Sequence, residues 1–252
     1  MEHAARVHHS LFRFYGPLND FLPYQRRQHS IDYSFSGSPG LRDAIQAQGV
    51  PHTEVDMVLV DSVPQRFGFH LCGGEQVSVY PRFHSLVIDK DCRLGSEPLK
   101  VPRFILDVHL GKLCRHLRLL GFDTAYGNDY EDRYIIDRGL AEQRIILTRD
   151  LGILKHGCVA HGYYVRSTDA NQQIEEVLQH FKLQQCCQPL SRCIKCNGGL
   201  EQVRKSAVLS QIPEGTCRSY ELFYQCQNCQ QIYWRGAHYV GLMEKLARIE
   251  GA

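Results

Sequence analysis

Four cysteines occur as two closely spaced pairs in the C-terminal part of the chain, Cys193-x-x-Cys196 and Cys226-x-x-Cys229. Two residues between cysteines allow one tight turn to present both thiolates to a single metal ion, and two such turns complete a tetrahedral shell. Because sulfur fills all four positions, no position remains for a catalytic water. The spacing therefore predicts a structural zinc site, and the chemistry of the chain is expected elsewhere.

Two disulfides are the alternative use of these cysteines. The chain has 11 cysteines, an odd number, and its first ten residues contain no apolar stretch of the kind that secretory signals carry. No apolar run approaches the roughly 20 residues that a membrane span needs. These features favour a cytoplasmic protein without a membrane segment, in which Cys-x-x-Cys turns bind metal.

The size and charge of the chain restrict its class only broadly. With 252 residues, 43% of them hydrophobic and 22% charged, the chain is expected to form two or three globular domains. A net charge of +2 does not by itself indicate a nucleic-acid binder. Basic residues are locally enriched between Arg103 and Arg118 and in the cysteine-rich region, which fits a polyanionic partner. Ordinary solvated surface charge is the alternative.

Residues 8–83 read as a small mixed domain. Strand patterns at 10–15, 28–35, 55–60 and 76–80 surround one short helix that follows Gly40 and ends at Gly49. The order strand, strand, helix, strand, strand is that of a β-grasp domain.

Residues 101–185 alternate between strands and helices, and this predicts a parallel sheet with helices on both faces. Residues 189–248 form the predicted zinc ribbon with a closing helix. The whole chain is therefore expected to be of the α/β class. We expect strands at 101–107, 124–126, 144–148 and 162–165, and helices after Asp107, at 129–139, at 171–181 and at 237–248.

Aspartates follow two of these strands. Asp107 and Asp150 each come at or directly after the end of an apolar strand, so in a parallel sheet both lie at the edge where open α/β sheets bind ligands. Asp132, near the start of a helix, can point into the same crevice. Three converging carboxylates repel one another unless a divalent cation joins them, and hard oxygen ligands suit Mg2+ or Mn2+.

Helix capping is the alternative role for these aspartates. It explains Asp150 well, because a short helical pattern follows, and Asp107 less well. Asp129 and Glu131 lie near enough to Asp132 to compete for its place. If the carboxylates do crowd together, Asp107→Asn is expected to raise the melting temperature of the metal-free protein.

Neighbouring polar residues could serve the same site. Thr148 is expected to hydrogen-bond a carboxylate or a phosphate, and Arg149 to hold the scissile phosphate, with a surface salt bridge as its alternative. The helix that follows Asp107 carries further cations that we expect to contact the phosphate backbone of a polyanionic substrate, namely Lys112, Arg115 and Arg118.

The motifs together resemble a known family. DVHLGKLCRHLRLLGFD, RIILTRDLGIL, RCIKCNGGL and FYQCQNCQQIYWRGAH are similar to the Mut-seven C-terminal RNase domain. This resemblance implies a PIN-like nuclease fold with a C-terminal zinc ribbon, and metal-dependent cleavage of RNA by a metal-activated water. The acidic positions of the family fall on Asp107, Asp132 and Asp150. The chain departs from the family at His116, where an aromatic residue is usual, and a fourth acidic ligand has no evident place.

The N-terminal domain carries a resemblance of its own. FYGPLNDFLP, GVPHTEVDMVLVD and VSVYP are similar to ubiquitin-like domains of the sulfur-carrier type, and such a domain often precedes the bacterial nuclease domain. Carriers end in Gly-Gly, whereas this chain continues through Pro81-Arg82-Phe83. We therefore expect a docking module for a protein partner or for its own nuclease domain, and a chain beginning near Lys100 is expected to fold without it.

Two other functions remain open at this stage. The first is a non-catalytic zinc-ribbon adaptor for RNA or protein, with an inactive acidic cluster. The second is a phosphotransferase that forms an aspartyl-phosphate at Asp107. It is disfavoured because the second residue after that aspartate, where such enzymes carry a carboxylate, is His109. The sequence identifies neither the RNA nor the cut site.

Overall fold

The structure is a computed structural model that describes residues 6–83, 89–97 and 99–250. The chain divides into two compact units. One contains Met1–Glu97 together with Asp150–Tyr163, and the other contains Pro98–Arg149 together with Tyr164–Ala252. Each unit is described by itself.

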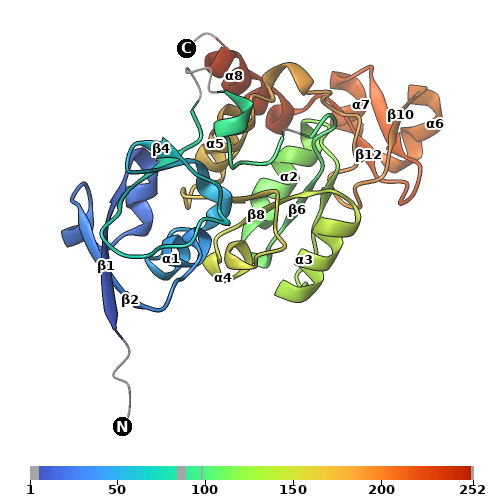
Figure 1. Ribbon diagram of the computed structural model, residues 1–252. Helices are drawn as coiled ribbons and strands as arrows, with labels where there is room; N and C mark the ends of the chain where they lie inside the picture. Colours follow the sequence, from blue (N-terminus) through green and yellow to red (C-terminus); the bar gives the residue numbers. More distant parts are fainter. Residues whose placement is uncertain (1–5, 84–88, 98, 251–252) are drawn as a thin grey trace. The chain divides into compact units, whose positions relative to one another are not determined.

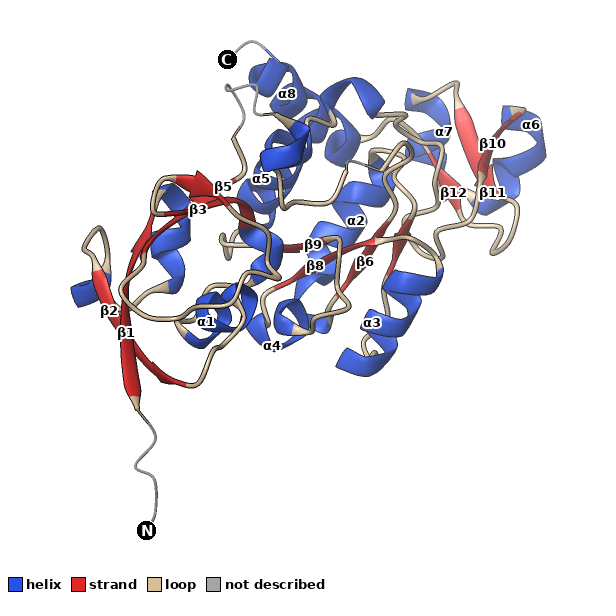
Figure 2. Cartoon of the chain, in the orientation of Figure 1, coloured by secondary structure: helices blue, strands red, loops and turns tan. Residues whose placement is uncertain are grey.

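A five-stranded mixed sheet forms the N-terminal part of the first unit (Figure 2). Its strand order is β2-β1-β5-β3-β4, with β1 and β5 parallel and the pairs β1/β2, β3/β5 and β3/β4 antiparallel. The predicted β-grasp architecture is therefore confirmed. The elements are β1 (Val7–Phe14), η1 (Gly16–Phe21), η2 (Tyr24–Arg26), β2 (Ile31–Ser36), α1 (Leu41–Ala47), η3 (His52–Glu54), β3 (Val55–Val60), β4 (Val63–Pro64), β5 (Gln76–Pro81) and η4 (Lys90–Cys92).

The core of this sheet follows from the alternation of its strands. Phe12 and Phe14 in β1 are almost fully buried, whereas the alternate residues Leu11 and Arg13 are exposed and half-buried, respectively. The apolar face of α1, with Leu41, Ala44 and Ile45 at 0% exposure, covers the same side. Burial of one such large side chain contributes roughly 1.5–3 kcal/mol, so this face fixes the register of the strands.

The second segment of this unit, residues 150–163, begins with α4 (Leu151–Lys155), which packs on η3. His52 Nε2 lies 2.9 Å from the Val159 carbonyl, and Ser96 Oγ donates to the Ala160 carbonyl at 2.8 Å. Residues that follow Asp150 are thus held by the N-terminal unit. This argues against the expectation that a chain beginning near Lys100 folds unchanged.

The second unit contains a four-stranded sheet of order β7-β6-β8-β9, in which β6 pairs in parallel with β7 and β8. Helix α3 packs on β6 and β8, and α2 packs on β7 and α5 (Figure 1). The predicted parallel sheet with flanking helices is confirmed. The elements are β6 (Phe104–Leu106), η5 (Val108–Leu110), α2 (Gly111–Leu119), β7 (Thr124–Ala125), α3 (Asp132–Ala141), β8 (Ile145–Thr148), β9 (Gly162–Tyr164), α5 (Ala170–Phe181) and η6 (Gln184–Cys186).

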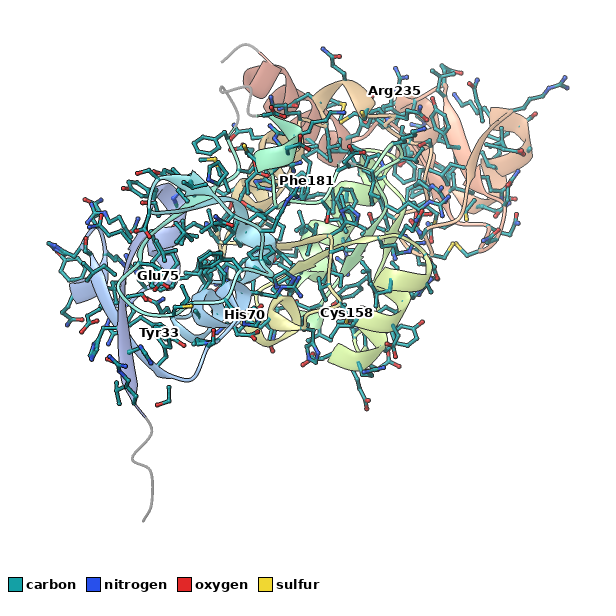
Figure 3. The ribbon with its side chains drawn as sticks, viewed as in Figure 1. Tyr33, His70, Glu75, Cys158, Phe181 and Arg235 are labelled. Carbon is teal, nitrogen blue, oxygen red and sulfur yellow. The ribbon has the colours of Figure 1, made fainter. Side chains whose placement is uncertain are left out.

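Apolar residues at helical spacing seat α2 in this unit. Leu113 and Leu117 are fully buried on one face of the helix, and Gly121 follows it with φ +94°. A side chain at Gly121 would collide with the Gln188 carbonyl, so a glycine is required there. At the other side of the core, Phe181 at the end of α5 (Figure 3) meets Phe104 edge to face, with ring centroids 6.2 Å apart.

The cysteine-rich region adds a three-stranded antiparallel sheet of order β10-β11-β12. Val208, Ile212, Phe223 and Ile232 form its small core, with Trp234 packed against it. The elements are β10 (Leu200–Val203), α6 (Lys205–Val208), η7 (Leu209–Gln211), α7 (Glu214–Ser219), β11 (Phe223–Cys226), β12 (Ile232–Tyr233) and α8 (Ala237–Glu250). In the part of the chain that the structure describes, no helix has the length and apolar content to cross a membrane.

Candidate functional site

The four paired cysteines come together at the turn before β10 and the turn after β11. Their sulfur atoms all lie within 4.8 Å of one another, with Cys193 Sγ 3.5 Å from Cys229 Sγ and Cys196 Sγ 3.4 Å from Cys226 Sγ. These separations are far above the roughly 2.05 Å of a disulfide bond. All four are free thiols, so the disulfide alternative does not describe this structure.

The geometry of this cluster fits zinc. Thiolates about 2.3 Å from a central zinc lie about 3.8 Å apart in a tetrahedron, close to the observed separations. Backbone N–H groups of Cys196 and Cys229 point at the sulfurs of Cys193 and Cys226, at 3.5 Å each, as in a zinc knuckle. Although burial acts to raise the pKa of Cys193, hydrogen bonds from the Tyr233 hydroxyl and the Cys196 N–H outweigh it and lower that pKa to about 7.

Backbone and side-chain hydrogen bonds fasten the first knuckle to α2. Arg118, only 7% exposed, donates from NH1 to the carbonyls of Ile194 at 3.0 Å and Lys195 at 3.1 Å. Its Nε donates to the Thr124 carbonyl at 2.9 Å. The guanidinium thus joins the knuckle to the sheet. The expected contact of Arg118 with RNA stays a prediction.

Asp123 is a second connection, and sequence reasoning did not identify it. Its Oδ1 accepts from Arg144 NH1 at 2.7 Å and from Asn197 Nδ2 at 2.8 Å. Burial alone would raise the pKa of Asp123, but these two donors and the charges of Arg144 and Arg192 lower it. Only the position of Asp123 directly before the short β7 could have signalled this role.

Asp107 lies directly after the short central strand β6 and is 3% exposed. Its Oδ2 accepts from the Thr148 hydroxyl at 2.5 Å and from the Arg149 N–H at 2.7 Å, both at the end of β8. Its Oδ1 accepts from the His109 N–H at 2.8 Å, so Asp107 also caps η5. The predicted bond between Thr148 and a carboxylate is confirmed.

The same bonds change one expectation about Asp107. Three donors hold its carboxylate in place, and an asparagine would turn one acceptor into a donor that faces an N–H. Relief of repulsion therefore competes with a lost hydrogen bond, and we expect the loss to be larger.

Arg149 is held differently from either expectation. Its NH1 donates to the backbone carbonyls of Val165 at 2.8 Å, Arg166 at 2.6 Å and Ser167 at 2.9 Å. The guanidinium also lies 5.9 Å from the centre of the Tyr164 ring. Arg149 thus stabilises the chain after β9, while its backbone N–H orients Asp107.

Asp132 and Asp150 are exposed at the starts of two helices. Asp132 is the first residue of α3, after Glu131 at the N-cap position. Asp150 caps α4, with Oδ1 accepting from the Gly152 N–H at 2.6 Å, as the capping alternative expected. Among the described residues, the four thiols form the single group of three or more potential ligands close enough for one ion. A shared metal site of the three aspartates stays a prediction.

Lys112 and Arg115 project from the exposed side of α2. Leu113 and Leu117 on the opposite face are buried, so the helix presents these two cations outward. His116, the position that departs from the family pattern, lies with Nδ1 3.2 Å from the Ala170 carbonyl at the start of α5. This residue therefore connects α2 to the start of α5.

Two family matches cover most of the chain. Residues 102–246, more than half of the sequence, match the Mut7-C RNAse domain. The chain belongs to this family. Residues 7–87 match the Mut7-C ubiquitin domain, in agreement with the β-grasp sheet. No curated protein and no solved structure matches the chain. Membership of the Mut7-C RNase family suggests nuclease activity.

Proposed function

We propose that this protein is a metal-dependent ribonuclease in which Asp107, Asp132 and Asp150 hold Mg2+ or Mn2+. The environment of Asp107 carries the proposal. Its carboxylate is 3% exposed, yet no Lys, Arg or His side chain of the described residues pairs with it within 4.0 Å. Buried charges in proteins are paired or bind metals, because desolvation of a lone charge is costly.

The donor set around Asp107 suits a hard divalent cation. Mg2+ is usually held by one or two carboxylates together with waters and phosphate oxygens of the substrate, so a dense cluster of carboxylates is not required. A carboxylate offers about four acceptor positions, and three are occupied by Thr148, Arg149 and His109. A bound ion would lower the pKa of a coordinated water and stabilise charge on the phosphodiester.

The residues around Asp107 would act by orienting its carboxylate. Donors that bond a carboxylate fix its direction, as the outer partners of metal ligands generally do. Under this proposal Thr148 and the Arg149 N–H have that role, and Arg149 is a positioning residue. Tyr126 lies near Asp107. Its pKa is raised, first by burial and then by the Cys114 thiol and the Asp107 carboxylate.

Cleavage of a labelled single-stranded RNA under single-turnover conditions tests the proposal. We expect Asp107→Asn, Asp132→Asn and Asp150→Asn each to reduce the rate by at least a hundredfold. The matched control is Asp137→Asn in the same helix as Asp132, where the carboxylate forms an exposed ion pair with Arg133, and it should cleave normally. Normal cleavage by both Asp107→Asn and Asp150→Asn would refute the assignment.

A non-catalytic adaptor for RNA or protein is the second candidate. One observation favours it: the caps at Asp107 and Asp150 give both side chains a structural role without a metal. Under either function we propose that the ubiquitin-like domain binds a protein partner. The zinc site needs reduced thiols, and on that ground we place the protein in the cytoplasm.

A further inference from the structure

The second unit contains a pocket of about 740 Å³. It lies between the start of α2, the turn after β7, the segment that leads into α5, and the first zinc knuckle. This volume is in the range of small-molecule sites, roughly 300–1,000 Å³. None of the four clustered cysteines lines the pocket, and of the residues that donate to the Asp107 carboxylate only His109 does.

Its lining is cationic without any opposing carboxylate. The charged lining residues are Lys112, Arg115, Arg118 and Lys195, and no Asp or Glu contributes to the walls. The whole chain, in contrast, has 29 Lys and Arg against 27 Asp and Glu. Lys112, Arg115 and Lys195 are exposed, and in the described part of the chain no carboxylate pairs with them within 4.0 Å.

The uncharged part of the lining also suits an anion attached to an aromatic base. Helix α2 starts in the pocket wall, and its N-cap residue, Leu110, offers no side-chain acceptor to the first N–H groups. A helix N-terminus of this kind attracts phosphate. Tyr126 lines the pocket, and its hydroxyl donates to the Val108 carbonyl at 3.0 Å and to Asn128 Oδ1 at 2.7 Å.

The pocket is close to Asp107 along the chain. His109, whose N–H bonds the Asp107 carboxylate, is itself a lining residue. Two acidic residues adjoin lining residues in sequence. Asp169 uses its carboxylate to cap α5 at the N–H groups of Asn171 and Gln172, and Asp129 is exposed beside the lining residue Asn128. A phosphate chain that passes Asp107 therefore meets a pocket whose own charged lining residues are all cations.

We propose that this pocket binds a nucleotide of single-stranded RNA, with its phosphate at Lys112, Arg115 and Lys195 and its base against Tyr126. The inference rests on the proposed ribonuclease function, which makes RNA the polyanion. Single strands present splayed bases that stack on aromatic side chains, whereas a duplex is recognised across a broad groove surface. An open pocket with a tyrosine in its lining fits the former.

Fluorescence anisotropy with the full-length, zinc-loaded protein tests this inference. The probe is a labelled ten-nucleotide oligouridylate, compared with a blunt RNA hairpin, without added Mg2+ or Mn2+. We expect Lys112→Gln, Arg115→Gln and Lys195→Gln each to weaken binding about tenfold at low salt. Each should also reduce the slope of log K against log salt by about 0.7, the value for one phosphate contact on a single strand.

Two variants serve as matched controls outside the pocket. Lys205→Gln removes an ammonium that pairs with Glu221, and Arg218→Gln removes an exposed guanidinium that pairs with Glu214. Both should bind RNA as the wild type does. Unchanged circular dichroism and zinc content confirm that each variant is folded.

Several outcomes would overturn the inference. They are unchanged affinity in all three pocket variants, equal losses in the two controls, or tighter binding of the hairpin than of the single strand. Pocket-dependent binding of inorganic phosphate without any binding of RNA would assign a free anion as the ligand. If the pocket variants bind RNA as the wild type does and still cleave it, only the proposed role of the pocket is refuted. If the wild type binds RNA through the pocket but does not cleave it, only the proposed ribonuclease activity is refuted.

Discussion

Replacement of Asp107 by asparagine has two opposite effects on the stability of the fold. The change removes a buried charge, which by itself is favourable. It also turns one of two acceptor atoms into an NH2 group, although both atoms receive hydrogen bonds from fixed donors. The side chain is expected to keep its oxygen toward Thr148 and Arg149, and this places the NH2 group against the His109 N–H.

The magnitude follows from the His109 N–H, whose part-buried hydrogen bond loses its acceptor. Such a loss costs about 1–3 kcal/mol. For chains of 150–250 residues, each kcal/mol lowers the melting temperature by about 2–4 °C. We therefore expect Asp107→Asn to melt about 2–12 °C below the wild type when no divalent metal is added.

Calorimetry measures this difference directly, and Asp132→Asn is the control. Asp132 is exposed in the first turn of α3, so its replacement removes only a favourable helix-dipole interaction of roughly 0.3–1 kcal/mol. A melting temperature of Asp107→Asn at or above that of the wild type would show that repulsion or desolvation of the carboxylate dominates, and it would refute the reasoning.

Three further predictions concern the zinc ribbon and the N-terminal unit. Cys196→Ser should abolish stoichiometric zinc and unfold the ribbon, because structural zinc supplies on the order of 10 kcal/mol; retained zinc by metal analysis would contradict this. Burial lowers the pKa of His52, and the charge of Arg42 acts in the same direction. The hydrogen bond to the Val159 carbonyl acts to raise this pKa but is outweighed. The unfolded state then binds a proton first as the pH falls below about 6.5. The wild type should therefore lose more stability between pH 7 and 5 than His52→Gln, and equal pH profiles by chemical denaturation would exclude this role. Deletion of residues 1–97 removes the partners of 150–163, so hydrogen exchange in that segment should become faster, and unchanged exchange would show that it folds independently.

Local pattern was sufficient to predict the architecture where burial is periodic. The strand predicted at 55–60 coincides with β3, because apolar residues there alternate toward one core. The helix after Asp107 and its end before Gly121 followed from leucines at helical spacing. The spacing of the paired cysteines correctly predicted that the four thiols lie together, since two residues between cysteines form one tight turn.

Contacts between residues that are far apart in the sequence could not be predicted from local patterns. The bonds from Arg118 to the knuckle and from Asn197 to Asp123 join positions more than 70 residues apart, and no periodicity marks them. The short helices α6 and α7 carry too few turns to produce a pattern. The assignment of residues 150–163 to the N-terminal unit depends on tertiary packing against η3, which the sequence of that segment does not reveal.

The most direct test of the account is a metal titration of RNA cleavage. The zinc-loaded protein, freed of Mg2+ and Mn2+ by gel filtration, is mixed with single-stranded RNA, and each ion is then added back in turn. The account predicts no cleavage before addition, cleavage that saturates with Mg2+ or Mn2+, and none by Asp107→Asn under the same conditions, with one zinc per chain throughout. Cleavage that is independent of added metal, or equally fast in Asp107→Asn, would contradict it.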